Sequence, residues 1–165
     1  ITFDHRDYSA SIQRVGWAAL VLDPIIDGYH FTRVLVDDGS SLNLIYQDIV
    51  CKMGIDPTKI SHSNTTFKGV TSGPESHCTG SLLLEVIFGF PDNFRSKNLT
   101  FHVAPFQSGY QALLGREAFA RFNAIPHYAS LMLKMPGPRG TITVNGNIER
   151  SLRAEDRVAA LSAAH

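Results

Sequence analysis

Two adjacent carboxylates are the clearest candidates for chemistry in this sequence. The stretch VLVDDGSS, residues 34–41, is a short apolar strand that runs into Asp37 and Asp38, followed by a glycine and two serines. A carboxylate at the end of a buried strand lies close to low dielectric, where its pKa can shift and where it can act as an acid or a base. Gly39 allows a tight turn here, and Ser40 can donate a hydrogen bond to the acid. The same residues also suit an ordinary solvated turn, because Asp, Gly and Ser are favoured in turns.

A second element of the same kind follows later in the chain. In QALLGREAF, residues 111–119, an apolar strand ends at Gly115, and REAFARF behind it has the length of one or two helical turns. Between the two elements lies a stretch of strand-like sequence around a Gly/Ser/Pro centre. This stretch predicts a long hairpin with a polar, flexible tip near residues 71–76. The chain therefore has one apolar strand followed by Asp-Asp-Gly-Ser, a second apolar strand followed by Gly115, and a predicted hairpin between them.

Most of the elements that must position these residues are predicted strands. Asp27-Gly28 between two apolar runs predicts a hairpin. In LIYQDIVCKMG, Ile45, Ile49 and Met53 fall at helical spacing with Gly54 as a C-cap, which predicts a short helix. PDNFRSKN, residues 91–98, is typical of a loop, LTFHV is typical of a strand, and ASLMLKM with TITVNG predicts a further hairpin. Many short strands with few helices favour a small barrel or sandwich.

Composition excludes several classes of protein. The chain has 165 residues, and its 15 basic and 15 acidic side chains leave no net charge, which argues against nucleic acid as a direct partner. No apolar run reaches the roughly 20 residues that span a membrane, so no membrane partner is expected. Cys51 and Cys78 match no metal spacing and suit reduced thiols in a cytoplasmic protein. We expect no metal and no cofactor.

We expect one central domain. Residues 1–14 have little periodicity and are interpreted as a leader or linker. Residues 15–146 contain the predicted strands, including those that precede Asp37 and Gly115. Residues 147–165 are predicted to be helical, as a tail or a linker to the next segment of a longer polypeptide.

The order of these elements resembles a known family. ITFDHRD, VLVDDGSSLNLIY, MGID, LTFHV, ALLGREAFARFNAIPHYASLMLKMPGP and GTITV together resemble the protease domain of Gypsy-type LTR retrotransposon polyproteins, particularly those of plants. The resemblance covers most of the chain. It implies a mainly β fold, a small closed antiparallel barrel of the retropepsin type with one lobe per chain, short helices and the helical tail.

The resemblance also assigns roles to individual residues. The family's Asp-Thr-Gly falls on Asp37, Asp38 and Gly39, so Asp37 is the implied catalytic carboxylate, and Ser40 is implied to hydrogen-bond it. The flap falls on the hairpin of residues 69–77, with its tip at Gly69, Val70, Thr71, Ser72 and Gly73. The apolar-apolar-Gly-Arg motif falls on Leu113, Leu114, Gly115 and Arg116, where it implies structural support under the active-site loop and, for Arg116, contacts to neighbouring backbone or acids.

One residue departs from the family pattern. Asp38 stands where the family usually has Thr, whose hydroxyl donates across the two-fold axis of the dimer. An ionised Asp cannot donate a hydrogen bond. Two like charges about 4 Å apart also repel by about 1 kcal/mol in water and by several times that at lower dielectric.

Two functional hypotheses follow from these residues. The first is an aspartic endopeptidase that processes a retrotransposon polyprotein as a homodimer, with one Asp37 from each chain and an extended peptide as substrate. The second is an inactive remnant with the same fold, which acts as a dimerisation or peptide-binding module. Asp38 favours the second, whereas intact Asp37, Gly39, Ser40 and the motif of residues 113–116 favour the first.

Overall fold

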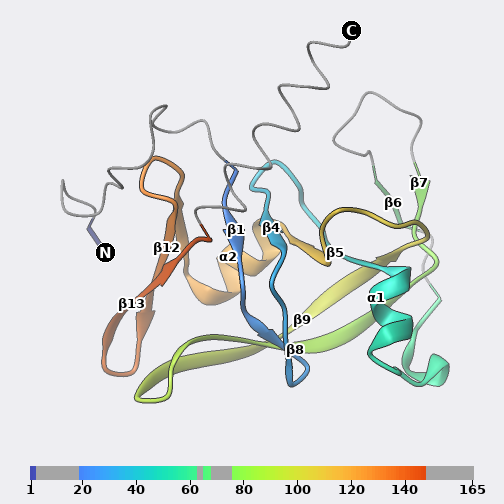
Figure 1. Cartoon of the computed structure of the whole chain (residues 1–165), viewed down its shortest axis with the longest axis horizontal. Helices are drawn as coiled ribbons and strands as arrows, with labels where there is room; N and C mark the ends of the chain where they lie inside the picture. The colour runs from blue at the N-terminus through green and yellow to red at the C-terminus, as the bar shows by residue number, and fades with distance from the viewer. Residues whose placement is uncertain (3–18, 63–64, 68–75, 148–165) are drawn as a thin grey trace, which may run out of the picture.

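The structure is a computed structural model that describes residues 1–2, 19–62, 65–67 and 76–147 (Figure 1). The predicted helical tail, apart from residue 147, and most of the predicted leader lie outside the described residues. The strands are β1 (Val21–Leu22), β2 (Ile25–Ile26), β3 (Tyr29–His30), β4 (Val34–Val36), β5 (Asn43–Tyr46), β6 (Thr66–Phe67), β7 (Ser76–His77), β8 (Gly80–Phe90), β9 (Asn93–Ala104), β10 (Ala112–Leu114), β11 (Ile125–His127), β12 (Met132–Gly137) and β13 (Gly140–Asn145). The helices are α1 (Gln47–Lys52), the 3-10 turn η2 (Pro57–Lys59) and α2 (Arg116–Phe122).

Most of these strands form one curled sheet. Its order is β1-β4-β10-β5-β9-β8-β2-β3, and β11-β12-β13 form a separate three-stranded sheet. The expected mainly β class is confirmed, but the expectation of a small closed antiparallel barrel is not. β10 pairs in parallel with β4, and β5 pairs in parallel with β9. Two parallel neighbouring strands need a long connection between them, and in this chain the connections contain the hairpins and α1.

The predicted Asp27-Gly28 hairpin is confirmed. β2 and β3 are joined by these two residues, and both have positive φ, 51° at Asp27 and 80° at Gly28. That pair of backbone conformations is the two-residue turn whose twist matches the strands on either side.

The longest hairpin differs from the prediction. β9 begins at Asn93, so only the first two residues of the stretch 91–98 form the turn and the rest is strand. Burial alternates along β8, where Leu82, Leu84, Val86 and Phe88 are buried while Leu83 and Glu85 are exposed. Residues 93–98 alternate between partly buried and exposed positions, and five of the six are polar. The composition of this stretch therefore resembles that of a loop, although it forms a strand.

The two α-helices among the described residues are close to their predicted places. α2 coincides with the predicted REAFARF helix. α1 begins only at Gln47, and Ile45 lies in β5, so the helical spacing of Ile45 with Ile49 was misleading. Gly54 follows the C-cap Met53 with φ of 65°, as expected for a glycine that ends a helix.

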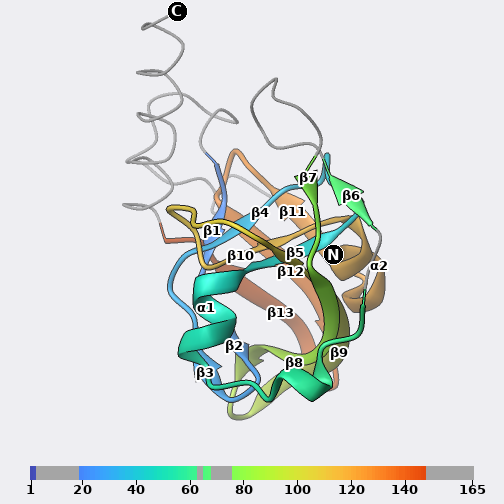
Figure 2. The ribbon, with the colours of Figure 1, turned by 90° about the vertical axis from the view of Figure 1, so that its right-hand side faces the viewer.

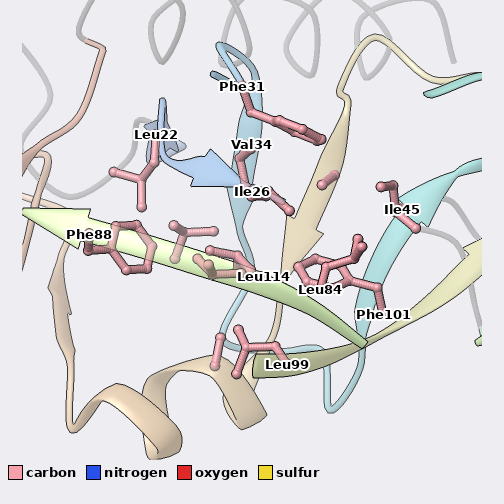
Figure 3. Packing of buried hydrophobic residues seen from close by; sticks show 14 of the residues in the cluster. Leu22, Ile26, Phe31, Val34, Ile45, Leu84, Phe88, Leu99, Phe101 and Leu114 are labelled. Atoms are coloured by element: carbon pink, nitrogen blue, oxygen red, sulfur yellow. The ribbon is translucent and has the colours of Figure 1, made fainter. Parts of the chain in front are cut away.

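The core fills the inside of the curled sheet (Figure 3). Leu22, Val34, Leu99, Phe101 and Leu114 are buried there, and each such side chain contributes roughly 1.5–3 kcal/mol by leaving water. Figure 1 shows β12 and β13 at the left of the molecule and α1 at the right, and Figure 2 shows α1 and α2 on opposite sides. Both views place the β4–β5 connection, the β11–β12 turn and the β6–β7 pair at the same end of the molecule.

Candidate active site

The two predicted strands that precede Asp37 and Gly115 lie side by side. β4 and β10 pair in parallel, with Leu35 opposite Leu113 and Val36 opposite Leu114. Because both strands run in the same direction, they end together, and Asp37 and Gly115 are the next residues on each. The backbone N–H of Asp37 donates to the carbonyl of Leu114 at 2.9 Å. Two segments far apart in the sequence therefore build one active-site candidate.

The Asp37 carboxylate is held by its own loop. Its Oδ1 accepts a hydrogen bond from the backbone N–H of Gly39 at 3.0 Å, and the carbonyl of Asp37 accepts one from the N–H of Ser40 at 3.2 Å. The side chain of Asp37 is half-buried, whereas Asp38 and Gly39 are exposed. This tight turn leaves the second carboxylate oxygen of Asp37 free of bonds within the loop.

Ser40 does not make the predicted bond to the acid. Its hydroxyl donates to the carbonyl of Leu42 at 3.0 Å and accepts from the N–H of Leu42 at 3.2 Å. The hydroxyl therefore closes a local turn, and the expectation that Ser40 hydrogen-bonds Asp37 is wrong for this chain. Serine often bonds to backbone two residues away in this manner, and that local geometry competes with longer-range contacts.

Gly115 supports the loop from beneath by close backbone approach. A Cβ atom at this position would lie 2.4 Å from the carbonyl oxygen of Leu42 and 2.7 Å from that of Ser40. The backbone N–H of the next residue, Arg116, donates to Ser40 O at 2.8 Å, while the Arg116 side chain is exposed. The expected contact of Arg116 to neighbouring backbone thus runs through its main chain.

Sequence reasoning missed the most buried polar residue of the site. Asn43, at the start of β5, has no solvent exposure. Its Oδ1 accepts from the N–H of Gly115 at 2.9 Å, and its Nδ2 donates to the carbonyl of Thr100 at 3.2 Å. One amide therefore joins the active-site loop, α2 and β9. The signal in the sequence was a single polar residue inside the apolar run LNLIY.

Two tyrosines near the acids were also missed. Burial raises the pKa of the Tyr46 phenol, a hydrogen bond with Ser108 opposes this rise, and the charge of Asp37 adds to it. Burial also raises the pKa of Tyr128, to about 12, with a further contribution from the charge of Asp38. Both phenols stay neutral at physiological pH and can donate hydrogen bonds.

A small apolar cluster lies on the face of the strands that Leu35 and, by alternation, Asp37 share. Alternate residues of a strand share a face, so Leu35 shares the face of Asp37 while Val34 and Val36 point to the main core. A second, smaller cluster consists of the buried Leu44, Cys78 and Leu113 with the partly buried Leu35 and Leu42. Leu114 belongs to the main core instead. The two leucines of the predicted support motif thus serve opposite faces. Burial raises the pKa of the Cys78 thiol and keeps it protonated.

The predicted flap tip, Gly69 to Gly73, lies outside the described residues. Its base is described: β6 pairs antiparallel with β7, with Thr66 opposite His77 and Phe67 opposite Ser76. This hairpin base is at the end of the molecule that carries the β4–β5 connection (Figures 1 and 2).

Solved structures with the same fold are known. The chain is similar to a retropepsin-like aspartic protease from Rickettsia conorii, with 19% identity, a TM-score of 0.51, and coverage of 76% of this chain and 83% of the other. It is also similar to the retroviral protease-like domain of Ddi1 from Leishmania major, with 12% identity, a TM-score of 0.54, and coverage of 80% and 96%. At these identities the likeness shows the fold, which is that of retropepsin-like proteases.

Comparisons based on sequence add no relative. No protein-family model matches the chain, and no curated protein matches it. In the part of the chain that the structure describes, no helix has the length and hydropathy to cross a bilayer.

Proposed function

We propose that this chain is an aspartic endopeptidase with Asp37 as its catalytic carboxylate. The observation that carries the proposal is the parallel pairing of β4 with β10. This pairing places Asp37 next to Gly115, with the N–H of Asp37 bonded to the carbonyl of Leu114. The retropepsin-like fold supports the same conclusion. The Asp37 carboxylate is half-buried and fixed by a backbone N–H, which suits a carboxylate that acts as an acid or a base.

The active species we propose is a homodimer. Aspartic proteolysis needs two carboxylates that face one water molecule, and the chain contains a single Asp-x-Gly-Ser element. A two-fold axis through the active-site loops would bring one Asp37 from each subunit together. Two carboxylates about 3 Å apart cannot both ionise easily, so they share a proton. The ionised one accepts a proton from water as general base, and the protonated one polarises the scissile carbonyl.

We infer the substrate class from the apolar cluster on the face of the strands that Asp37 shares. Leu35 and Leu42 are its partly exposed members, whereas Leu44 and Leu113 are buried. An extended peptide with apolar side chains on both sides of the scissile bond would bury them against this cluster, while its backbone bonds to the flap and the loop as an added strand. By resemblance, the natural substrate is the polyprotein of a Gypsy-type retrotransposon, and the cytoplasm is the place of cleavage.

A cleavage assay tests the proposal. The purified domain would be incubated with a peptide library at about pH 5–6, where a shared-proton pair is favoured over alkaline conditions. We expect cleavage by the wild type, none by Asp37→Asn, and unchanged cleavage by Asp92→Asn. Asp92 is an exposed acid in the β8–β9 turn at the opposite end of the molecule (Figure 1). Cleavage that survives Asp37→Asn would refute the assignment.

A second function is favoured by one residue. Asp38 adds an acid that cannot donate across a dimer axis, which suits an inactive module that binds peptides or dimerises. A folded dimer, shown by circular dichroism and sedimentation, that cleaves no peptide either as wild type or as Asp38→Thr would support this alternative.

A further inference from the structure

The parallel pairing that brings Asp37 to Gly115 rests on a short ladder. β4 and β10 share three residue pairs, Val34 with Ala112, Leu35 with Leu113 and Val36 with Leu114. Every one of these side chains is apolar, so alternation of apolar and polar residues does not distinguish this register from one that is shifted by a residue. A shift of one residue would move the end of one strand by about 3.3 Å relative to the other and would carry Asp37 away from Gly115. The apolar pattern therefore leaves the register to other contacts.

Gln111, the residue before β10, makes such a contact. Its side-chain Oε1 accepts hydrogen bonds from the backbone N–H groups of Thr32 at 2.8 Å and Arg33 at 2.9 Å. The Thr32 hydroxyl donates to the same oxygen at 3.4 Å. Thr32 and Arg33 lie immediately before β4, and the backbone N–H of Gln111 donates to the carbonyl of Arg33 at 2.8 Å. Gln111 thus binds the entry of β4 through both its side chain and its main chain.

The same residue also contacts β5, the other neighbour of β10. The carbonyl of Gln111 accepts a hydrogen bond from the N–H of Tyr46, the last residue of β5, at 3.5 Å. Gln111 therefore fixes the start of β10 between its two neighbouring strands. Just beyond the other end of β10, the amide of Asn43 accepts the N–H of Gly115. A side-chain amide thus binds backbone at each end of this three-residue strand.

We propose that Gln111 is a positioning residue that sets the register of β4 against β10 and so determines where Asp37 meets Gly115. The inference rests on the proposed function for its catalytic consequence. Gln111 binds at the entry of the two strands, and Asp37 begins the active-site loop at their exit. Because the strands run in the same direction, an offset at one end is carried to the other. The bond from the N–H of Asp37 to Leu114 O, at 2.9 Å, belongs to this register and reports on it.

The test compares two substitutions of Gln111 in the cleavage assay. Gln111→Met keeps the approximate length of the side chain and removes the strong acceptor, whereas Gln111→Glu keeps an acceptor oxygen in the same place. We expect Gln111→Met to lower kcat at least about 10-fold with little change in KM, and Gln111→Glu to lower it less than about 3-fold. Gln107→Met, at an exposed position in the loop before β10, is the matched control and should leave kcat unchanged. Equal losses in Gln111→Met and Gln111→Glu, or full activity of Gln111→Met, would overturn the proposal.

Amide hydrogen exchange, measured by NMR, reports on the register without catalysis. In Gln111→Met we expect exchange at least about 10-fold faster at the amides of Thr32, Arg33 and Asp37, relative to the amide of the core residue Phe101. Faster exchange at Thr32 and Arg33 with no change at Asp37 would show that Gln111 only closes its own turn, and would overturn the proposal. A chain that cleaves nothing, but in which exchange at Asp37 depends on Gln111, would refute the proposed function while supporting the role of Gln111 in the register.

Discussion

The buried side-chain amide of Asn43 accepts a hydrogen bond from the backbone N–H of Gly115 at 2.9 Å, and this bond joins β5, which follows the Asp37 loop, to the start of α2. Asn43 has no solvent exposure, and its Nδ2 is bound to Thr100 O at 3.2 Å. Neither backbone group could turn to water if the amide were lost. The stability of the site therefore depends on a residue that touches no substrate.

Replacing Asn43 tests this dependence. Asn43→Leu keeps the approximate volume and leaves the N–H of Gly115 and the carbonyl of Thr100 unpaired, at a cost of about 1–3 kcal/mol for each buried group. We expect a fall of about 2–4 kcal/mol in the free energy of unfolding, measured by urea denaturation. Asn98→Ala, on the exposed face of β9, should change it by less than about 0.5 kcal/mol. Equal effects of the two substitutions would contradict the role given to Asn43.

Gly115 should tolerate no side chain. A Cβ atom 2.4 Å from Leu42 O and 2.7 Å from Ser40 O cannot be relieved by a rotamer, because both neighbours are backbone. Gly115→Ala should destabilise the fold by about 3 kcal/mol and abolish cleavage, since the active-site loop must move.

Gly140 provides the control for this substitution. Gly140→Ala introduces strain from φ of 105° with no atom within 4 Å of the new Cβ. We expect it to cost about 1–2 kcal/mol and to leave cleavage intact at temperatures where the protein is folded. Full activity of Gly115→Ala would show that the loop is not held by close approach.

Acid should weaken the fold through His102. Burial lowers the pKa of His102, and the carboxylate of Glu117 opposes this shift. As the pH falls below about 6.5, the unfolded chain binds a proton at this histidine before the folded chain does, so the free energy of unfolding decreases. Above that pH both forms are neutral and the effect is absent. The urea midpoint should fall less between pH 7.5 and 5.5 in His102→Gln than in the wild type, whereas His30→Gln, at an exposed position, should behave as the wild type.

Alkali should weaken the fold through Tyr128. Burial, and after it the charge of Asp38, raises the pKa of this phenol to about 12, whereas an unfolded tyrosine ionises near 10. The unfolded chain therefore loses its proton first, and stability present below pH 10 is lost as the pH rises toward 12. Stability measured by urea across this range should decline less steeply in Tyr128→Phe than in Tyr29→Phe. Identical slopes would show that the Tyr128 phenol is not perturbed by folding.

The sequence by itself determined the local features, because these depend on the conformational preferences of residues that are neighbours in the chain. Asp27-Gly28 specifies a hairpin through backbone conformations that these residues accept more readily than others. The apolar runs that end at Asp37 and at Gly115 mark strands followed by turns, and REAFARF specifies α2. Each depends on propensities and periodicity within a few residues, so it can be predicted without knowing which other segment it packs against.

Tertiary structure decided which of these features meet, and what else joins them. The parallel pairing of β4 with β10 brings Asp37 to Gly115, and no local pattern states which strands pair. Ser40 turned to Leu42, although the sequence allowed a bond to Asp37. The role of Asn43 arises from its hydrogen bonds with Gly115 and Thr100, which lie far along the chain. Long-range pairing is selected by burial of the whole core and by the need to satisfy every buried polar group, and these conditions exist only once the chain has folded.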